Sequence, residues 1–390
     1  MSNKNLKRFS FSYFYKKKEK NLNLHEPSFN NQEIKDLKKC ILKKNVSTAG
    51  SLTKIFEKKI SSIIKCKHVI ATNSGTSALH LALITLGIKK GDEVLMPSLN
   101  YIASANACLY LGAKPHFVDV DTETLGVDPK SLKEYLSKNT FLKNGKCINK
   151  KTRNQIKSII CLHTFGHPCK IIEIKKISRK FNLSIIEDAA EALGSYYKKR
   201  HVGNFGDIGI LSFNGNKIIT TGGGGAILTN NSKYAKKILS LATIYKKKHP
   251  WKYEYDNLGY NYRMPSLNSA IGLSQIKKLK NFIKKKRLLY KIYEKKISKL
   301  KLFKLFKEPI NCKSNYWLQT IILKNDNIKL RNQIIINSHK DGIKVRPVWR
   351  PLHKSKYLLK MPRMKLKNTR ILENRLINLP SSPDITKILN

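Results

Sequence analysis

Short apolar strands alternate with helical segments through the first two thirds of this 390-residue chain. Between most of the strands, apolar residues recur every three or four positions, which is typical of amphipathic helices. This alternation predicts an α/β layer fold around a mostly parallel sheet. Residues 138–154 are polar and contain a glycine, so we expect a loop there. The predicted strands are Lys67–Thr72, the latter part of Gly91–Pro97 after a turn, Pro115–Val120, Ser158–His163, Ser184–Glu187, Ile208–Phe213 and Gly225–Thr229.

The character of the sequence changes after Met264-Pro265, where a long, lysine-rich helical stretch begins. Two strands are expected beyond it, which predicts a smaller α+β domain. The first residues are polar and basic, and we expect them to form a mobile arm or a strap across a partner. The predicted division is a basic extension over residues 1–24, a large domain over 25–265 and a small C-terminal domain over 266–390.

Lysine is scarce in one segment of a chain that otherwise uses it freely. The chain has 77 Lys and Arg among 390 residues, so about six are expected between His201 and Ser232, yet only Lys217 occurs there. This depletion indicates a packed interior with one cationic group inside it. A lysine amine in such surroundings can act as a nucleophile. The simpler alternative is a lysine that reaches solvent from a strand edge.

The formal net charge of +52 would ordinarily suggest a nucleic acid or an acidic membrane as partner. Here the lysines are spread over almost every predicted surface helix. No zinc-finger, recognition-helix or aromatic-plus-basic RNA-binding pattern accompanies them. We therefore expect no nucleic-acid partner, and a nucleic-acid or acidic-surface binder is kept as the alternative.

The seven cysteines show no paired spacing and no CxxC, so neither a metal site nor a disulfide framework is expected. Free thiols fit a reducing cytoplasm. No run of some 18 apolar residues occurs, and the N-terminal apolar run is too short for a signal peptide. We expect a cytoplasmic protein without membrane contact.

Two further features lie where a sheet of this kind binds ligands. Asp188 follows the strand Ser184–Glu187, and residues outside the carboxyl ends of such strands face the ligand crevice. The small polar turn Asn73–Ser77 joins a strand to a helix, a geometry that holds phosphate on free backbone N–H groups. A lysine, an acid and a phosphate turn together are the requirements for pyridoxal phosphate. Helix capping explains the turn or Asp188 alone, but not Lys217.

The chain resembles the DegT/DnrJ/StrS family of pyridoxal-phosphate sugar aminotransferases almost from end to end. The matching segments include "NSGTSALHLAL", "GDEVLMPSLNYIASANA", "HTFGHP", "IEDAAEALGS", "GDIGILSFNGNKIITTGGGGAI", "GYNYRMPSLNSAIGLSQ" and "VRPVWRPLH". The resemblance implies the fold-type-I, aspartate aminotransferase-like architecture, in which a mixed, mostly parallel sheet forms the large domain.

The resemblance also implies the cofactor contacts. Lys217 resembles the lysine that binds pyridoxal phosphate covalently, and Asp188 the partner of the cofactor's ring nitrogen. Tyr101 stands where an aromatic ring stacks on the cofactor. Asn261 resembles the residue that reaches the phosphate from a neighbouring subunit. The phosphate cradle corresponds to Gly75, Thr76, Ser77 and Ser212.

Two substrate contacts are implied in the same way: Arg263 for the carboxylate of the amino donor, and His163 of "HTFGHP". Two departures accompany them. Glu191 replaces the usual Gln beside the cofactor's ring oxygen, which puts that contact in doubt. The usual Thr-Gly-Glu-Gly-Gly reads Thr221 to Gly225 without the acid, a variant that resembles the LegC-like branch.

That branch implies amination at C4 of a UDP- or GDP-linked 2-acetamido-2,6-dideoxy-4-hexulose, for sugars of the bacillosamine or legionaminate type. Glutamate is the implied amino donor, and the implied assembly is a homodimer with shared active sites. Family members with His in place of the lysine are dehydratases, so Lys217 favours transamination. C3-amination, a perosamine-type substrate and a non-catalytic cofactor-binding protein stay open as alternatives.

Overall fold

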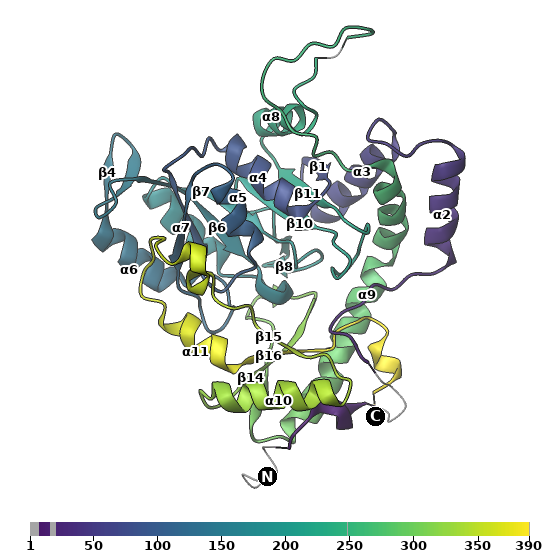
Figure 1. The fold of residues 1–390 in the computed structure, drawn as a ribbon, viewed down its shortest axis with the longest axis vertical. Helices are drawn as coiled ribbons and strands as arrows, with labels where there is room; N and C mark the ends of the chain where they lie inside the picture. The colour runs from purple at the N-terminus through teal and green to yellow at the C-terminus, as the bar shows by residue number, and fades with distance from the viewer. Residues whose placement is uncertain (1–7, 16–20, 248, 390) are drawn as a thin grey trace.

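The structure, a computed structural model, describes residues 8–15, 21–247 and 249–389. Its centre is a mixed sheet in the order β1-β11-β10-β7-β6-β2-β3 (Figure 1). Strand β11 runs antiparallel to both neighbours, and the remaining pairs in this order are parallel. The mostly parallel sheet is therefore confirmed. Its strands are β1 (His68–Thr72), β2 (Glu93–Pro97), β3 (Lys114–Val118), β6 (Gln155–Leu162), β7 (Ser184–Asp188), β10 (Ile208–Ser212) and β11 (Gly225–Thr229).

Helices cover both faces of this sheet, because successive residues of a strand point to opposite sides. In β6, Ile159 and Cys161 face one core and Ile160 faces the other, and Ile185 and Ile186 of β7 divide in the same way. One core lies under α3 (Leu52–Ile64), α6 (Pro129–Asn139), α7 (Ile171–Lys180) and the first half of α9 (Ser266–Ser298). The other lies under α4 (Gly75–Thr85), α5 (Ala103–Leu109) and α8 (Ser232–Ala242).

Residues 138–154, expected to loop out, instead form a hairpin of β4 (Thr140–Lys143) and β5 (Lys146–Asn149), and β5 extends the sheet beside β6. The hairpin turns at Asn144-Gly145, both at positive φ, which is the favoured turn for a two-residue connection. Alternate residues of β5 are buried, which the lysines around them conceal in the sequence.

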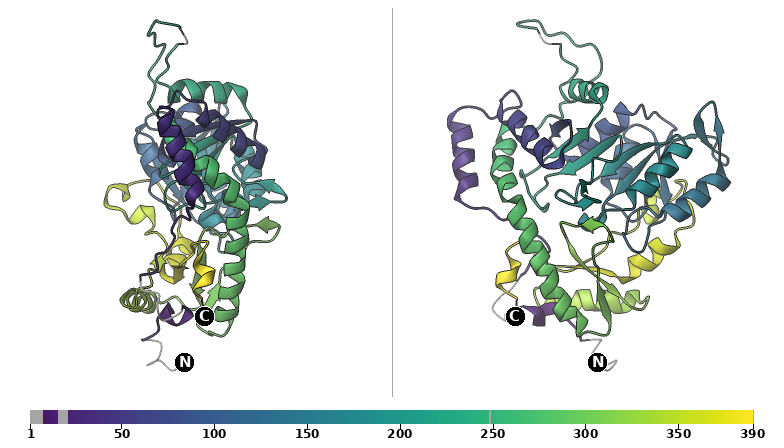
Figure 2. Two further views of the ribbon diagram at one scale, coloured as in Figure 1. Left: turned by 90° about the vertical axis from the view of Figure 1, so that its right-hand side faces the viewer. Right: turned by 180° about the vertical axis from the view of Figure 1, so that it is seen from behind.

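A second, four-stranded sheet, β12-β14-β16-β15, lies beside the far end of α9 (Figure 2). Its strands are β12 (Phe303–Leu305), β14 (Gln319–Leu323), β15 (Arg346–Pro347) and β16 (Leu376–Leu379). The helices α10 (Ile328–Lys340) and α11 (Lys367–Arg375) belong to the same part of the chain. A three-stranded ribbon of β8 (Tyr196–Tyr197), β9 (Arg200–His201) and β13 (Cys312–Lys313) joins the two regions. Helix α2 (Asn31–Leu42) packs on α9. The domain bounds given above stay a prediction.

The N-terminal segment does not behave as a mobile arm over the residues that the structure describes. The turn η1 (Phe11–Phe14) buries Phe9, Phe11 and Phe14 against α10, β12 and the end of α9. The Phe11 N–H donates to Ser338 Oγ at 3.2 Å, and the Tyr15 and Tyr293 hydroxyls lie 2.5 Å apart. The expectation failed because the aromatic residues, not the surrounding lysines, decide where this segment packs.

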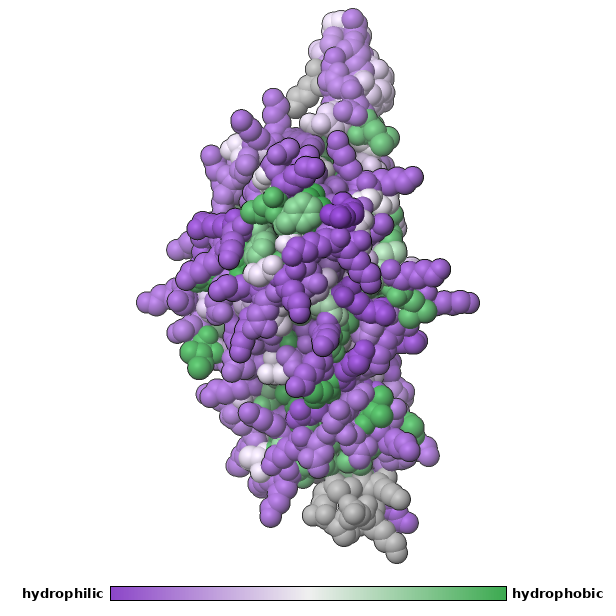
Figure 3. Space-filling model, turned by 90° about the vertical axis from the view of Figure 1, so that its left-hand side faces the viewer, coloured by the Kyte–Doolittle hydropathy of each residue, from purple (hydrophilic) through white to green (hydrophobic). Residues whose placement is uncertain are grey.

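The surface is predominantly hydrophilic on the face shown in Figure 3, with apolar residues in small separate patches. Among the described residues, none of the helices has the length and apolarity needed to span a membrane.

Candidate active site

The predicted cofactor residues meet at one edge of the central sheet. Strands β2, β7 and β10 are parallel to one another, so their carboxyl ends lie at the same edge. Tyr101 follows β2, Asp188 ends β7 and Ser212 ends β10. Helix α4 begins at this edge directly after β1, and Lys217 follows β10 by five residues.

The predicted phosphate site lies at the start of α4. Ser74 caps the helix by accepting the Ser77 N–H at 3.0 Å, and the Ser74 and Ser77 hydroxyls are 2.9 Å apart. Helix N-termini concentrate unpaired N–H groups and positive potential. Ser212 lies so close that a Cβ on Gly75 would approach the Ser212 Cβ to 3.2 Å. A hydroxyl and the helix start therefore face one small space.

Glycine at position 225 permits this arrangement. A Cβ there would come within 2.6 Å of the Gly75 nitrogen, so any other residue would push β11 away from the start of α4. The neighbouring Gly222 has φ +83, and Asn268 Nδ2 holds this loop by donating to the carbonyls of Thr221 and Gly223. The glycine run thus shapes the start of α4, the predicted phosphate cradle, from the side of β11.

Asp188 is 5% exposed and accepts hydrogen bonds from the Ala190 N–H at 3.1 Å and from Ser104 Oγ at 3.3 Å. Burial raises the pKa of Asp188 above its usual value. A buried carboxylate of this kind gains most from a protonated ring nitrogen, because that partner compensates its lost hydration.

Lys217 and Glu191 form the central pair of the site. The Lys217 Nζ lies 3.5 Å from Glu191 Oε1, and Glu191 Oε2 accepts the Phe165 N–H at 2.8 Å. Burial raises the pKa of Glu191 to about 7, although the ammonium of Lys217 opposes that rise. Glu191 can therefore carry a proton near neutral pH, and a protonated acid can donate a hydrogen bond as the usual Gln does.

Trp317 was not predicted as a site residue. Its ring lies over the amine of Lys217, with 4.1 Å between Nζ and the ring centroid, and its Nε1–H donates to the Asn216 carbonyl at 2.7 Å. Trp317 precedes β14 and is 100 residues further along the chain, so no local pattern connects it with Lys217. In the sequence Trp317 is distinguished only by its residue type, since the chain has just three tryptophans.

Asn100 was missed as well. It is 1% exposed beside Tyr101, and neither atom of its amide has a hydrogen-bond partner in the described part of the chain. A buried amide without partners is costly, so this side chain is available to a ligand at the same edge. Tyr101 itself is 58% exposed, as a ring that stacks on a ligand requires.

The structure does not support His163 as a substrate contact. The residue is completely buried, its Nδ1 accepts the Cys169 N–H at 3.2 Å, and its Nε2 lies 3.1 Å from Glu187 Oε2. Because Nδ1 accepts, the proton is on Nε2 and is donated to the carboxylate. Both ring nitrogens are thus used, and the His163 N–H donates to the Asp188 carbonyl at 3.1 Å. His163 supports the floor of the site.

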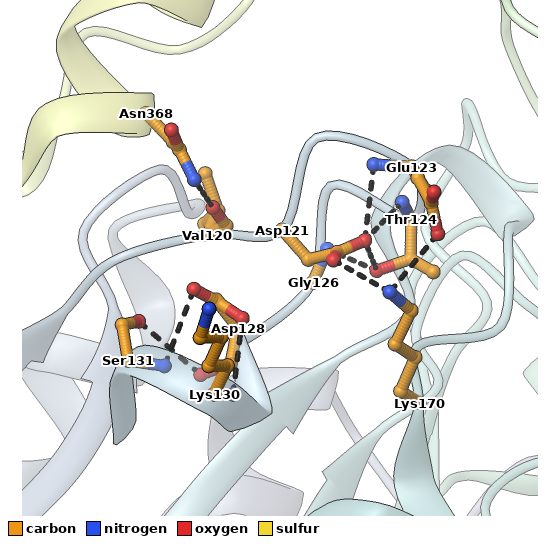
Figure 4. A network of polar contacts seen from close by, with 10 residues as sticks. All are labelled: Val120, Asp121, Glu123, Thr124, Gly126, Asp128, Lys130, Ser131, Lys170 and Asn368. Carbon is orange, nitrogen blue, oxygen red and sulfur yellow. Dashed lines mark hydrogen bonds and ion pairs between the residues drawn. The ribbon is translucent and has the colours of Figure 1, made fainter. Parts of the chain in front are cut away.

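The segment after His163 is fixed by a polar network that Figure 4 shows. Lys170 Nζ bridges Asp121 and Glu123 at 2.8 and 3.0 Å, and Asn368 of α11 donates to the Val120 carbonyl at 2.8 Å. These contacts raise the pKa of Lys170 against the effect of burial. The network ties the loop after β3 to both the Lys170 segment and α11, behind the site.

Asn261 and Arg263 lie on a segment that runs beside the end of β1, where Arg263 pairs with Thr72 and the Asn261 carbonyl accepts from Asn73 Nδ2 at 3.4 Å. They line a hollow of about 740 Å³ at the base of the arm formed by residues 243–247 and 249–261, which projects away from the sheet in Figure 1. Arg263 Nη1 is paired with Glu57 Oε1 at 2.6 Å and also donates to the Ala71 carbonyl at 3.0 Å. A substrate carboxylate at Arg263 would have to compete with Glu57, so this role stays a prediction.

Comparisons with known proteins agree with this geometry. The sequence pattern of the DegT/DnrJ/EryC1/StrS aminotransferase family matches residues 27–388. The chain belongs to this aminotransferase family. It is 36% identical to the GDP-perosamine synthase of Escherichia coli O157:H7 over 93% of this chain and 94% of that protein.

Two further relatives extend the comparison. The chain is 33% identical to the UDP-4-amino-4,6-dideoxy-N-acetyl-beta-L-altrosamine transaminase of Campylobacter jejuni, over 82% of this chain and 81% of that protein. A DegT/DnrJ/EryC1/StrS aminotransferase from Brucella abortus has the same fold, with a TM-score of 0.82, 25% identity and 91% of each chain covered. The fold-type-I architecture is therefore confirmed, as is pyridoxal phosphate as the cofactor of this family.

The residues present fit that cofactor. Its phosphate would lie at the start of α4 beside Ser212, and its ring nitrogen at the buried carboxylate of Asp188. Tyr101 would cover the ring, and Lys217 would bind it covalently. When bound, pyridoxal phosphate acts as an electron sink that makes the α-proton of an amino acid acidic.

Proposed function

We propose that this aminotransferase moves an amino group from glutamate to C4 of a nucleotide-linked 4-keto-6-deoxy hexose that carries a 2-acetamido group. The observation that carries the proposal is the Lys217 amine, held 3.5 Å from Glu191 and beneath Trp317. It lies at the sheet edge where the predicted cofactor residues meet, called here the cofactor edge. Family membership supplies the reaction type. Its product would enter bacillosamine- or legionaminate-type surface sugars.

Each residue of the site would have a separate chemical role. The Lys217 amine would take the α-proton of the donor and return it at the cofactor, acting as general base and then as general acid. Asp188 would keep the cofactor's ring nitrogen protonated, because its buried carboxylate has few other partners to compensate its charge. Glu191 would hold a proton toward the cofactor's ring oxygen. Ser212 and the start of α4 would fix the phosphate end.

Support for C4 and for the N-acetyl group comes from the relatives' names. The Campylobacter jejuni relative is named for a UDP-linked 4-amino-4,6-dideoxy-N-acetyl sugar, and the Escherichia coli relative for GDP-perosamine. The glycine at 223, where the family commonly has Glu, further favours the LegC-like branch. A perosamine-type substrate is the second candidate, because the E. coli relative is the more similar of the two in sequence.

The test is a substrate panel. Purified protein with pyridoxal phosphate and glutamate is offered UDP- and GDP-linked 4-keto-6-deoxy sugars with and without the 2-acetamido group, and 3-keto sugars as the matched control. We expect 2-oxoglutarate to form with a 4-keto acetamido sugar, and NMR of the product to place the amine on C4. Formation of a 3-amino product, or turnover confined to sugars without the acetamido group, would contradict the proposal.

We also propose that the working unit is a homodimer with shared active sites. The arm over residues 243–261 exposes Trp251, Tyr253 and Leu258 to more than two thirds of their surface, although such side chains are usually covered. Asn261 and Arg263 lie at its base and line a hollow there. A second copy seated there would cover these apolar groups and receive Asn261 at its own phosphate cradle.

Mixing two inactive variants tests the shared site. Lys217→Ala and Arg263→Ala proteins are dissociated, mixed and reassociated, and native mass spectrometry counts the mixed dimers. If each site uses residues of both chains, random pairing restores roughly a quarter of wild-type activity, since half the dimers are mixed and each has one intact site. Mixed dimers without activity would place Arg263 in the site of its own chain.

A further inference from the structure

Trp317 makes two contacts with the segment that carries Lys217. Its indole N–H donates to the carbonyl of Asn216, the residue before the lysine, at 2.7 Å. The face of the same ring lies 4.1 Å from the Lys217 Nζ. One side chain thus fixes both the backbone before Lys217 and the position of its amine.

The backbone of Trp317 is anchored by Asn315. The backbone N–H of Trp317 donates to Asn315 Oδ1 at 2.8 Å. Asn315 Nδ2 in turn donates to the carbonyls of Glu191 and Leu193, both at 2.9 Å. The segment before β14 is therefore anchored to the loop that carries Glu191. The ring of Trp317 and the carboxyl of Glu191 approach the same amine with their relative placement fixed.

Lys286 of α9 also holds the backbone of Trp317. It is completely buried, and its Nζ donates to the Trp317 carbonyl at 2.9 Å and to the Ser381 carbonyl at 2.5 Å. Burial lowers the pKa of Lys286 well below its usual value. Among the described residues no carboxylate pairs with it. A buried lysine that binds only carbonyls costs stability, which points to a positional role.

His25 completes the support. It is 9% exposed, its ring lies 6.4 Å from that of Trp317, and neither ring nitrogen has a partner within the described chain. Burial, with Lys286 and Lys217 nearby, lowers its pKa well below the usual range, so the ring is neutral. The Ser381 N–H fixes the preceding residue by donating to the Leu24 carbonyl at 2.7 Å. A neutral ring can pack on Trp317 without repelling either lysine.

We infer that Trp317 is a positioning residue for Lys217, and that Lys286 and His25 hold it in place. The ring closes one side of the amine while Glu191 Oε1 stands at 3.5 Å from it. An aromatic face attracts the ammonium form but offers no proton acceptor. The amine is thereby kept at the cofactor edge after it has taken a proton. This inference deepens the proposed function and rests on it for the reaction, but not for the geometry.

Three substitutions separate the contributions of Trp317. Trp317→Phe keeps an aromatic face and loses the N–H, Trp317→Leu loses both, and Lys286→Met removes the support while keeping an unbranched side chain. Lys284→Met, on the exposed side of the same helix, is the matched control. We expect kcat to fall about 3- to 30-fold in Trp317→Leu, the range that a cation–π contact spans, with the KM for the keto sugar unchanged. Trp317→Phe should recover part of that loss.

A second measurement does not depend on turnover. In a Trp251→Phe/Trp349→Phe background, Trp317 is the one remaining indole of the three in the chain. Adding pyridoxal phosphate to the apo-protein should quench its fluorescence as the cofactor binds Lys217. Lys286→Met should weaken that quenching and slow cofactor capture, whereas Lys284→Met should change neither.

The two measurements give distinguishable failures. If no keto sugar is turned over, the proposed function fails, while capture and quenching still decide the role of Trp317. Wild-type capture and quenching in Lys286→Met, together with unchanged kcat in Trp317→Leu, would overturn the inference. A rise in KM alone would also overturn it, because it would make Trp317 a substrate contact.

Discussion

Replacing Glu191 by Gln should make the apo-protein more stable at high pH and leave its stability almost unchanged at low pH. Burial raises the pKa of Glu191 from 4.5 to about 7. Since one pKa unit corresponds to 1.36 kcal/mol, ionising this carboxyl in the folded state costs about 3 kcal/mol more than in the unfolded chain. Gln has the same shape and cannot ionise, so the variant escapes this cost.

The direction follows from proton linkage. Between the unfolded and folded pKa values the native state holds more protons than the unfolded state, so stability falls as pH rises through this window. Below about pH 4.5 both states are protonated and Glu191 behaves like Gln, whereas above about pH 7 the full difference is reached. The free energy of unfolding of the Gln variant should therefore exceed that of the wild type by an amount that grows with pH and approaches about 3 kcal/mol at pH 8.

Urea unfolding of the apo-proteins across this range measures the difference directly. Subtracting wild type from variant removes the pH dependence of the other charged groups, which matters in a chain with a net charge of +52. Glu134→Gln on the exposed face of α6 is the matched control for the substitution itself. A difference for Glu191→Gln that does not change with pH would refute the raised pKa and the proton that Glu191 is expected to carry.

Three other substitutions have defined outcomes. Lys217→Arg should abolish turnover with the fold intact, because Arg stays protonated and cannot bind the cofactor covalently; transamination above a trace would remove Lys217 from its role. Asp188→Asn should slow proton abstraction by several powers of ten, each worth about 1.4 kcal/mol of barrier, and stopped-flow absorbance would show a near-normal rate if Asp188 were only a cap. Phe11→Ala should lower the free energy of unfolding by about 3–5 kcal/mol, as expected for a completely buried ring, whereas half-exposed Tyr13→Ala should cost less; equal losses would mean that η1 does not pack as described.

The central sheet could be predicted because each strand is short, apolar and almost free of lysine. Strand β10 and the segment around Lys217 stood out against a lysine-rich background, and the cofactor residues lie at the ends of those strands. Such residues are fixed by local sequence together with the general rule that parallel strands end at one edge. The hairpin of β4 and β5 was missed because lysines flank the few buried residues of its short strands.

The contacts that the sequence did not reveal are long-range. Trp317 reaches Lys217 from 100 residues away, and Lys286 supports Trp317 from a helix that reads as a lysine-rich surface helix. For His163 the motif suggested a substrate contact, whereas in the structure both ring nitrogens are bound internally. Composition says which residues are available, and only packing decides which side chains face the ligand.

The pairing of β1 with β11 sets an order of events during synthesis. His68 lies opposite Thr229, so β1 must wait for 161 more residues before its partner exists. At the usual pace of translation this interval is roughly ten to thirty seconds. The start of α4 packs against both β10 and β11, so a nascent chain shorter than β11 lacks one wall of the predicted phosphate cradle. The N-terminal aromatic residues wait longer still, because Tyr15 pairs with Leu389.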